Sequence, residues 1–213
     1  MAARSAAARS DAADTVDDLL ATAERLFAER GVENVALTQI VALSGQKNRS
    51  ALHYHFGSRS GVLGAVMDRR LAAINARRLA LLEALPADAP PGQVVRAEIA
   101  ALGLAVVEAP WGPDYISILA QVRFHPGLLG ERVSDAHLSG LRLARQRLRA
   151  AAPHLPEALV ARRAGWIADA VVFELARWTR DTPLADRTAA AMSILLDELA
   201  AFGTAGLLAP PQS

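Results

Sequence analysis

The stretch that decides the fold is Gln46-Lys47-Asn48-Arg49-Ser50-Ala51-Leu52-His53-Tyr54-His55-Phe56-Gly57. Leu52 and Phe56 lie four residues apart, so they would share one face of a helix. The opposite face would present mainly hydrogen-bond donors and positive charge. A short helix of this kind is suited to contact the phosphate backbone and the base edges of DNA.

The surrounding sequence favours the same interpretation. No Asp or Glu occurs between Asn34 and Met67, although the chain holds 22 acidic residues and has a net charge of +1. An acid-free window lowers the repulsion towards phosphate. A short helix is expected from about Leu37 to Leu43, and Gly45 supplies a turn before the next helix. Two short helices joined in this way form a helix-turn-helix.

The remaining chain is also expected to be helical. Apolar side chains recur at helical spacing from about residue 14 to 30, from 59 to 85 and in several later segments up to residue 202. We find no apolar–polar alternation typical of a strand and no internal repeat. The sequence therefore predicts an all-α fold of about nine helices, with a three-helix N-terminal head and a larger helical body.

Composition narrows the class of protein. With no Cys among 213 residues, the chain has neither disulfides nor thiolate metal sites, which fits a cytoplasmic protein. Charged residues interrupt its apolar runs, and the N-terminus lacks the apolar region of a signal peptide, so we expect no membrane association. His53 and His55 would point to opposite sides of a helix, which argues against a shared metal ion. We find no catalytic motif and expect no catalytic residue, metal or cofactor.

Several motifs agree in order and spacing with a known family. The motif Leu26-Phe27-Ala28-Glu29-Arg30-Gly31 is followed by Ile40, by Gly45 and by the motif Tyr54-His55-Phe56-Gly57-Ser58-Arg59, with Leu63 after it. Over roughly residues 14–70 the chain resembles the N-terminal domain of TetR-type transcriptional repressors. The resemblance implies a homodimer whose bodies enclose a ligand pocket and whose last two helices form a four-helix interface. It also implies that ligand binding moves the fourth helix and spreads the two DNA-binding heads.

Three features depart from the family pattern. The family usually has one residue fewer in the turn, so Gln46 or Lys47 is extra, and we align from the Tyr54-His55-Phe56 end. Ala36 stands where Ser or Thr commonly caps the second helix, so either Asn34 would cap it instead or Thr38 would bind phosphate from its first turn. Gly61 stands where an acidic residue often completes the cap that begins at a Ser58-like residue, so the capping box is missing.

We divide the chain into a disordered arm (1–13), a helix-turn-helix DNA-binding domain (14–58), a connecting helix (59–85) and a ligand-binding and dimerisation domain (86–213). Lys47 and Arg49 can pair with guanine and Asn48 with adenine. By the resemblance, Arg59 would bind phosphate just past the recognition helix. The predicted DNA-binding residues are Thr38, Lys47, Asn48, Arg49, Ser50, His53, Tyr54 and Arg59.

Large side chains in the middle helices are candidates for an apolar pocket that binds a small hydrophobic or aromatic effector. They are Trp111, Tyr115, Leu119, Phe124, His125, Trp166 and Phe173. The last two helices carry more apolar surface than one body needs, which favours a homodimer. The candidate dimer residues are Ile167, Val171, Trp178, Met192, Leu195 and Leu199.

These observations predict a dimeric transcriptional repressor that binds a palindromic double-stranded DNA operator and is released by a small apolar molecule. One alternative is a DNA-binding regulator of the same fold that has no small-molecule ligand. A second is an all-α enzyme that acts on an apolar substrate, which perturbed titratable groups converging in a cavity would favour. A helical scaffold protein would leave the donor-rich, acid-free head unexplained.

Overall fold

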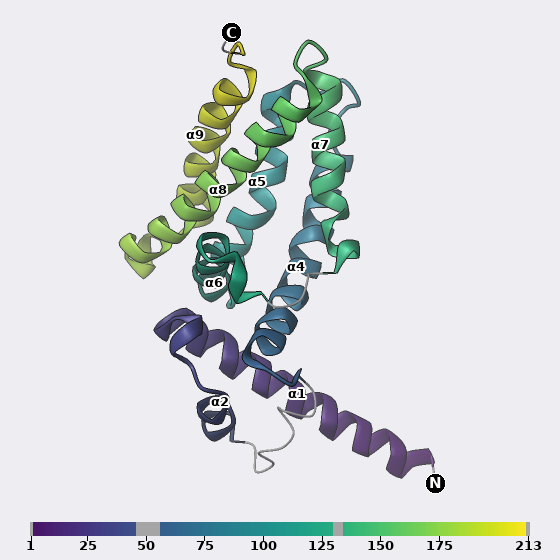
Figure 1. The fold of residues 1–213 in the computed structure, drawn as a ribbon, viewed down its shortest axis with the longest axis vertical. Coiled ribbons are helices and arrows are strands. Elements are labelled where there is room, and N and C mark those ends of the chain that lie inside the picture. The colour runs from purple at the N-terminus through teal and green to yellow at the C-terminus, as the bar shows by residue number, and fades with distance from the viewer. Residues whose placement is uncertain (1, 46–55, 130–133, 212–213) are drawn as a thin grey trace. The chain divides into compact units, whose positions relative to one another are not determined.

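The computed structural model describes residues 2–45, 56–129 and 134–211, and within these ranges every regular element is a helix. The eight α-helices are α1 (Ala2–Arg30), α2 (Leu37–Leu43), α4 (Arg59–Glu83), α5 (Pro91–Glu108), α6 (Gly112–Phe124), α7 (Ser139–Ala151), α8 (Glu157–Asp181) and α9 (Ala189–Leu208) (Figure 1). Short 3-10 helices are η1 (Val32–Asn34), η2 (Pro126–Leu128), η3 (Asp135–Leu138) and η4 (Leu184–Asp186). The predicted all-α fold is confirmed, with a helix number close to the nine expected.

The N-terminal segment differs from the expectation. We expected residues 1–13 to form a disordered arm, whereas α1 begins at Ala2 and continues without a break to Arg30. Ala is the strongest helix former, and most residues of this segment are Ala. The helix that begins in the first domain can therefore extend back through a segment whose composition had suggested disorder.

The chain divides into two compact units, which we describe separately. The first comprises Met1–Arg69 and Ser117–Val133, and the second comprises Arg70–Ile116 and Ser134–Ser213. Because α4 and α6 each contribute residues to both units, this division differs from one drawn at residues 58 and 85. The expected domain borders stay a prediction.

The first unit is built on apolar residues at helical spacing. Gly31 adopts a φ of 85° directly after α1, and Gly45 a φ of 73° after α2, so both helices end where a left-handed residue is needed. Of the three residues whose spacing predicts the buried side of α2, Ile40 and Val41 are buried and Leu37 is half-buried. The other buried apolar side chains of α1 and the start of α4 include Leu19, Leu20, Ala23, Leu26, Phe27, Val62, Leu63 and Val66.

The second unit is organised around α5, which packs against α7, α8 and α9 (Figure 1). α9 approaches α5 closely at Gly103, where an added Cβ would lie 2.7 Å from a methyl carbon of Leu196. Arg96 of α5 also donates from Nε to Asp197 of α9 at 2.6 Å. The arrangement therefore depends on a small residue at the centre of the α5–α9 interface and an ion pair at its edge.

A buried arginine closes the C-terminal end of α9. Arg163 of α8 is only 8% exposed, and it donates to the carbonyl oxygens of Leu207, Ala209 and Pro210. The last carbonyls of a helix have no partner within the helix and carry partial negative charge. Arg163 satisfies them from a neighbouring helix and so fixes α8 against α9.

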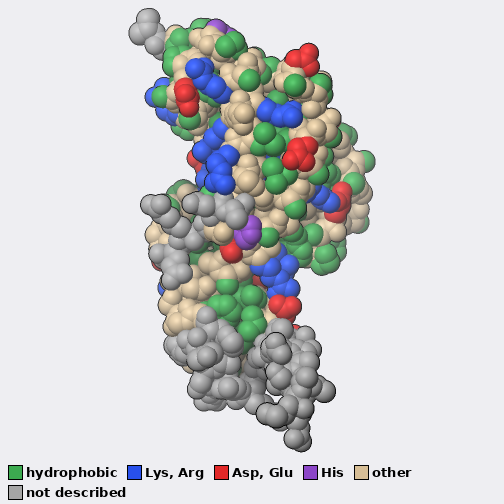
Figure 2. All heavy atoms as spheres, turned by 90° about the vertical axis from the view of Figure 1, so that its right-hand side faces the viewer, with side chains coloured by type: hydrophobic (Ala, Val, Ile, Leu, Met, Phe, Trp, Pro, Cys, Tyr) green, Lys and Arg blue, Asp and Glu red, His purple; other side chains and the backbone are tan. Residues whose placement is uncertain are grey.

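Charge is mixed on the exposed surface of the second unit. On the face drawn in Figure 2, Lys and Arg side chains are interspersed with acidic and apolar ones. This distribution differs from the acid-free window that the sequence places in the head.

Among the described helices, α9 is long and apolar enough to cross a membrane by length and composition alone. The sequence had led us to expect that charges would interrupt every such run. From Ala189 to Leu208 the only charged residues are Asp197 and Glu198, which are too few to interrupt the apolar run. The core helix of a soluble protein passes the same test, so this property alone is weak evidence for a membrane span.

Candidate functional site

The predicted recognition helix falls outside the described residues. Six of the eight predicted DNA-binding residues lie between 46 and 55, and their assignment therefore stays a prediction: Lys47, Asn48, Arg49, Ser50, His53 and Tyr54. What the structure describes is the segment on either side, from α2 to Gly45 and from Phe56 onwards.

The remaining two predicted DNA-binding residues are described. Thr38 is exposed in the first turn of α2, where free backbone N–H groups favour an anion. Arg59 is half-buried, and its Nη1 donates to the carbonyl oxygen of Glu33 at 2.6 Å. Arg59 thus joins the start of α4 to the end of η1, a role that the sequence could not indicate because its acceptor is a backbone atom.

The cap expected for α2 is not formed, whereas the cap expected for α4 is formed. Asn34 does not cap α2, since its amide donates to the carbonyl oxygen of Arg30 at the end of α1 (2.8 Å). The N–H of Ala36 instead donates to the side-chain carbonyl oxygen of Gln39 at 3.1 Å. Ser58 caps α4 as expected, because its hydroxyl accepts from the N–H of Gly61 at 3.1 Å.

Gln121 of α6 has a structural role in the first unit that no motif in the sequence predicts. Gln121 of α6 accepts from the N–H of Val32 at 2.8 Å and donates to the carbonyl oxygen of Phe27 at 3.2 Å. Both partners lie where α1 gives way to η1. Gln121 therefore gives the N–H of Val32 an acceptor, and it adds a second donor to the carbonyl oxygen of Phe27, which also accepts from the N–H of Gly31. No local signal could reveal a pairing across about 90 residues of chain.

The second unit contains a half-open cleft of about 250 Å³ between α4 and α5. Four of its eight lining residues are alanines, and two others, Arg77 and Glu108, form an ion pair. The Trp111 ring closes one side, with the Arg70 guanidinium 4.8 Å from its centroid. The cleft is lined by Ala73, Ile74, Arg77, Ala101, Ala105, Glu108, Ala109 and Trp111.

The predicted pocket residues occupy different environments. In the second unit, Trp111 lines the cleft and Tyr115 lies behind it, with the two rings edge to face at 5.9 Å. Tyr115 is buried, whereas Trp166 and Phe173 are exposed on α8. The first unit holds the remaining three: Leu119, which is half-buried, and Phe124 and His125, whose rings meet edge to face at the exposed end of α6. Within the second unit, only Trp111 and Tyr115 are brought together.

A group of buried polar residues lies one helical turn from the cleft. Arg78 of α4 donates from Nε to the backbone carbonyl of Glu98 on α5 at 3.3 Å. Asn75 donates to the Ser139 hydroxyl at 3.0 Å and accepts from the N–H of Gly140 at 2.8 Å. Burial lowers the pKa of Arg78 and raises the pKa of Glu98, because both charged forms are separated from water.

The predicted dimer residues divide into two groups. Val171 and Met192 are buried within the second unit of the chain. Four others are half-buried: Ile167, Trp178, Leu195 and Leu199. The large apolar side chains that α8 and α9 leave exposed are Trp166, Phe173, Ile194, Phe202 and Leu208.

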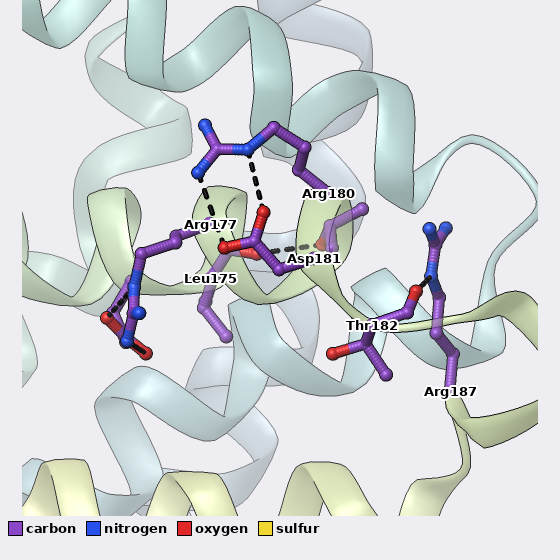
Figure 3. A network of polar contacts seen from close by, with 8 residues as sticks. Leu175, Arg177, Arg180, Asp181, Thr182 and Arg187 are labelled. Atoms are coloured by element: carbon purple, nitrogen blue, oxygen red, sulfur yellow. Dashed lines mark hydrogen bonds and ion pairs between the residues drawn. The ribbon is translucent and has the colours of Figure 1, made fainter.

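Polar contacts lie near the turn between α8 and α9 (Figure 3). Arg180 pairs with Asp181 at 2.9 Å, and Arg187 donates from Nε to the Thr182 carbonyl oxygen at 2.9 Å. Arg177 forms two hydrogen bonds with Glu174 one turn earlier. Of these contacts, only the Arg187–Thr182 hydrogen bond lies in the connection between α8 and α9, because both ion pairs lie within α8 and are exposed.

Comparison with solved structures gives the fold context. PfmR, a TetR family transcriptional regulator from Thermus thermophilus, is similar over 92% of this chain and 96% of its own, with 19% identity and a TM-score of 0.52. RolR, solved without ligand, is similar over 87% of this chain and 96% of its own, with 16% identity and a TM-score of 0.36. No curated protein sequence matches the chain.

Comparison with protein families covers both parts of the chain. Residues 19–66 match the model of bacterial regulatory proteins of the tetR family. Residues 100–206, half of the chain, match the model of the tetracyclin repressor-like C-terminal domain. The chain therefore belongs to the TetR family of DNA-binding transcriptional regulators.

Proposed function

We propose that the protein is a ligand-responsive repressor that binds a palindromic operator as a dimer and is released by a small, largely apolar molecule. The observation that carries the proposal is the cleft on α4. This helix begins at Arg59, beside the head, and lines the cleft with Ala73, Ile74 and Arg77. A ligand in the cleft would contact the same helix that leads out of the DNA-binding domain.

The response would be a shift between two conformations. A ligand can shift the equilibrium only by its difference in affinity for the two states, typically about 1–3 kcal/mol of coupling. DNA must then weaken ligand binding by the same factor as ligand weakens DNA binding. Since the operator is chromosomal DNA, we propose that the protein acts in the cytoplasm.

The dimer is proposed to form through α8 and α9. Trp166 is 59% exposed on α8, and Phe202 is 71% exposed on α9. We infer that these side chains belong to one apolar surface, and such a surface commonly marks a binding interface. The exposed acids Asp197 and Glu198 on α9 suit a protein partner with a polar rim better than the interior of a bilayer.

The proposed interface includes the half-buried Ile167, Trp178, Leu195 and Leu199, which would become fully covered by the partner. A two-fold axis would place two recognition helices roughly 34–36 Å apart, one DNA turn, or somewhat further. That geometry requires a palindromic operator.

Sedimentation tests the dimer. Ile194→Arg and Phe202→Arg should each convert the dimer to a monomer, because each places a charge in the proposed apolar interface. Leu184→Arg is the matched control: Leu184 is 80% exposed but lies in η4, outside both helices. An unchanged mass for both interface variants would reject the interface.

A gel-shift titration tests DNA binding, using operator DNA selected from a random pool. Arg49→Ala should relax the sequence preference at one base pair by about 1–3 kcal/mol. Full affinity and preference in this variant would reject the recognition-helix assignment. Metabolite extract should weaken the wild-type complex, and no effect of any extract would favour a regulator without a ligand.

A further inference from the structure

A buried cation, Arg78, lies one helical turn from the cleft of the second unit. Ile74 lines the cleft, and Arg78 follows it by one helical turn on the same face of α4. On α5, Ala101 lines the cleft and Glu98 lies one turn away. The hydrogen bond from Arg78 Nε to the Glu98 carbonyl joins these two positions. Arg78 therefore lies in the layer of the helix bundle next to the cleft wall.

The guanidinium of Arg78 lacks the partners that a buried charge needs. Arg78 is 6% exposed, and its Nη1 is buried without a hydrogen-bond partner among the described residues. An uncompensated buried charge is strongly unfavourable, and a buried donor without an acceptor adds to the cost. An anion bound at Nη1 would reduce both costs.

The surrounding residues do not supply that anion. Asn75 already bonds Ser139 and Gly140. The Glu98 carboxyl, the nearest acid, makes no ion pair with Arg78 among the described residues, and burial favours its neutral form. The electrostatic requirement of Arg78 is therefore met only in part by the protein.

The position of Arg78 is nevertheless well defined. An added Cβ at Gly140 would lie 3.2 Å from Cγ and Cδ of Arg78, so α7 packs closely against the aliphatic part of this side chain. Nε is held by the Glu98 carbonyl. The guanidinium is thus preorganised, which lowers the entropic cost of binding a ligand.

We propose that the effector is a small apolar carboxylic acid, whose carboxylate is bound by Arg78 and whose apolar part lies against the alanines of the cleft. This inference rests on the proposed function in that it assumes an effector for the α4–α5 cleft. Arg binds carboxylates strongly because its N–H donors match their geometry. A cleft of about 250 Å³ suits a compact acid with one aromatic ring or a short chain, since an engineered cavity of about 150 Å³ binds benzene.

The first test uses the wild-type protein alone. Benzoate, phenylacetate and octanoate are compared with benzamide, phenylacetamide and octanamide, which keep the shape and lack the charge. At roughly 10 mM, the acids that fit should raise Tm by a few degrees, while their amides should not. Equal shifts for acids and amides, or no shift with any acid, would overturn the proposal.

The second test changes the anchor. Arg78→Met should weaken binding of the stabilising acid by about 10- to 100-fold, because a charged hydrogen-bond partner is removed. Arg78→Lys should retain part of the affinity, and it decides the question if Arg78→Met does not fold. Arg180→Gln, which changes an exposed arginine of α8, is the control and should bind like wild type. Loss of binding in Arg77→Gln with full binding in both Arg78 variants would overturn the assignment to Arg78.

Gel shifts separate this inference from the proposed function. If the acid binds through Arg78 without altering DNA affinity, the carboxylate site at Arg78 is supported and the proposed release from DNA by an effector is contradicted. If acids and amides weaken the DNA complex equally, release by an effector stands and the carboxylate anchor fails.

Discussion

For a substitution at Gly61, the sequence pattern and the structure predict opposite changes in the stability of the protein. It is the third residue of α4 and stands where related sequences often carry an acid that completes a capping box. By that logic, a side chain at this position should stabilise the protein. In the structure, however, an added Cβ would lie 2.1 Å from the carbonyl oxygen of Phe56, so the backbone would have to shift.

The size of the stability change can be estimated by comparison with Gly64, one turn further along α4. An added Cβ at Gly64 meets nothing within 4 Å, so Gly64→Ala should show only the gain in helix propensity, about 0.5–1 kcal/mol. Gly61→Ala has the same propensity gain but also a backbone clash, and forcing atoms into a packed site costs about 1–3 kcal/mol. The two variants should therefore differ by roughly 1–3 kcal/mol, with Gly61→Ala the less stable.

Urea unfolding of the two variants beside wild type is the assay, with Tm as a second measure, since about 1 kcal/mol shifts Tm by roughly 2–4 °C in a protein of this size. Gly61→Glu is the third variant and should be destabilised like Gly61→Ala, despite its capping carboxylate. If Gly61→Ala is stabilised as much as Gly64→Ala, the close approach of Phe56 is refuted and the missing acid needs another explanation.

Three further predictions concern single side chains. Gln121→Ala should destabilise the first unit by about 1–3 kcal/mol, because the buried N–H of Val32 loses its acceptor, whereas Gln146→Ala on the exposed face of α7 should have no effect in the same urea titration. Arg59→Ala should lower Tm as well as the affinity for every DNA sequence and flatten its salt dependence, since Arg59 also bonds the Glu33 carbonyl; unchanged Tm would contradict its structural role. Burial raises the pKa of Glu98, so the folded state holds the proton more tightly than the unfolded chain, and stability should fall as pH rises from the ordinary value of 4.5 through the raised value. Glu98→Gln has no titrating group at this position, so its Tm relative to wild type should increase across that pH window. The positive charges of Arg78 and Arg145 oppose the effect of burial on the Glu98 pKa but do not outweigh it. A Tm difference that is independent of pH would argue against the raised pKa.

Local signals explain which parts of the fold could be predicted. The end of α1 at Gly31 and the end of α2 at Gly45 were predictable, because a left-handed residue is almost always glycine. The burial of Ile40 and Val41 followed from their spacing in a short helix. Ser58 could be recognised as a cap since capping depends on neighbours within one turn. Each of these inferences needed only a few adjacent residues.

Long-range pairing explains what could not be predicted. Gln121 reads as an ordinary polar residue of α6 until its two backbone partners near Val32 are known. Arg78 likewise follows Arg77 in sequence, yet Arg77 is exposed at the edge of the cleft and Arg78 is buried. Helical periodicity shows that two adjacent residues face different ways, but it does not show which of them the other helices cover.

The same limit governs the proposed dimer interface. α9 is apolar on most of its surface, so periodicity has no clear phase and cannot distinguish the face that packs inside the subunit from the face left for a partner. The phase is set by glycines where neighbouring helices approach: Leu196 packs against Gly103 of α5, and Gly203 packs against Ile167 of α8. Ile194 and Phe202 then lie outside the subunit core. On α9, Leu196 thus belongs to the core of the subunit, and the exposed Ile194 and Phe202 are the residues to test in the dimer.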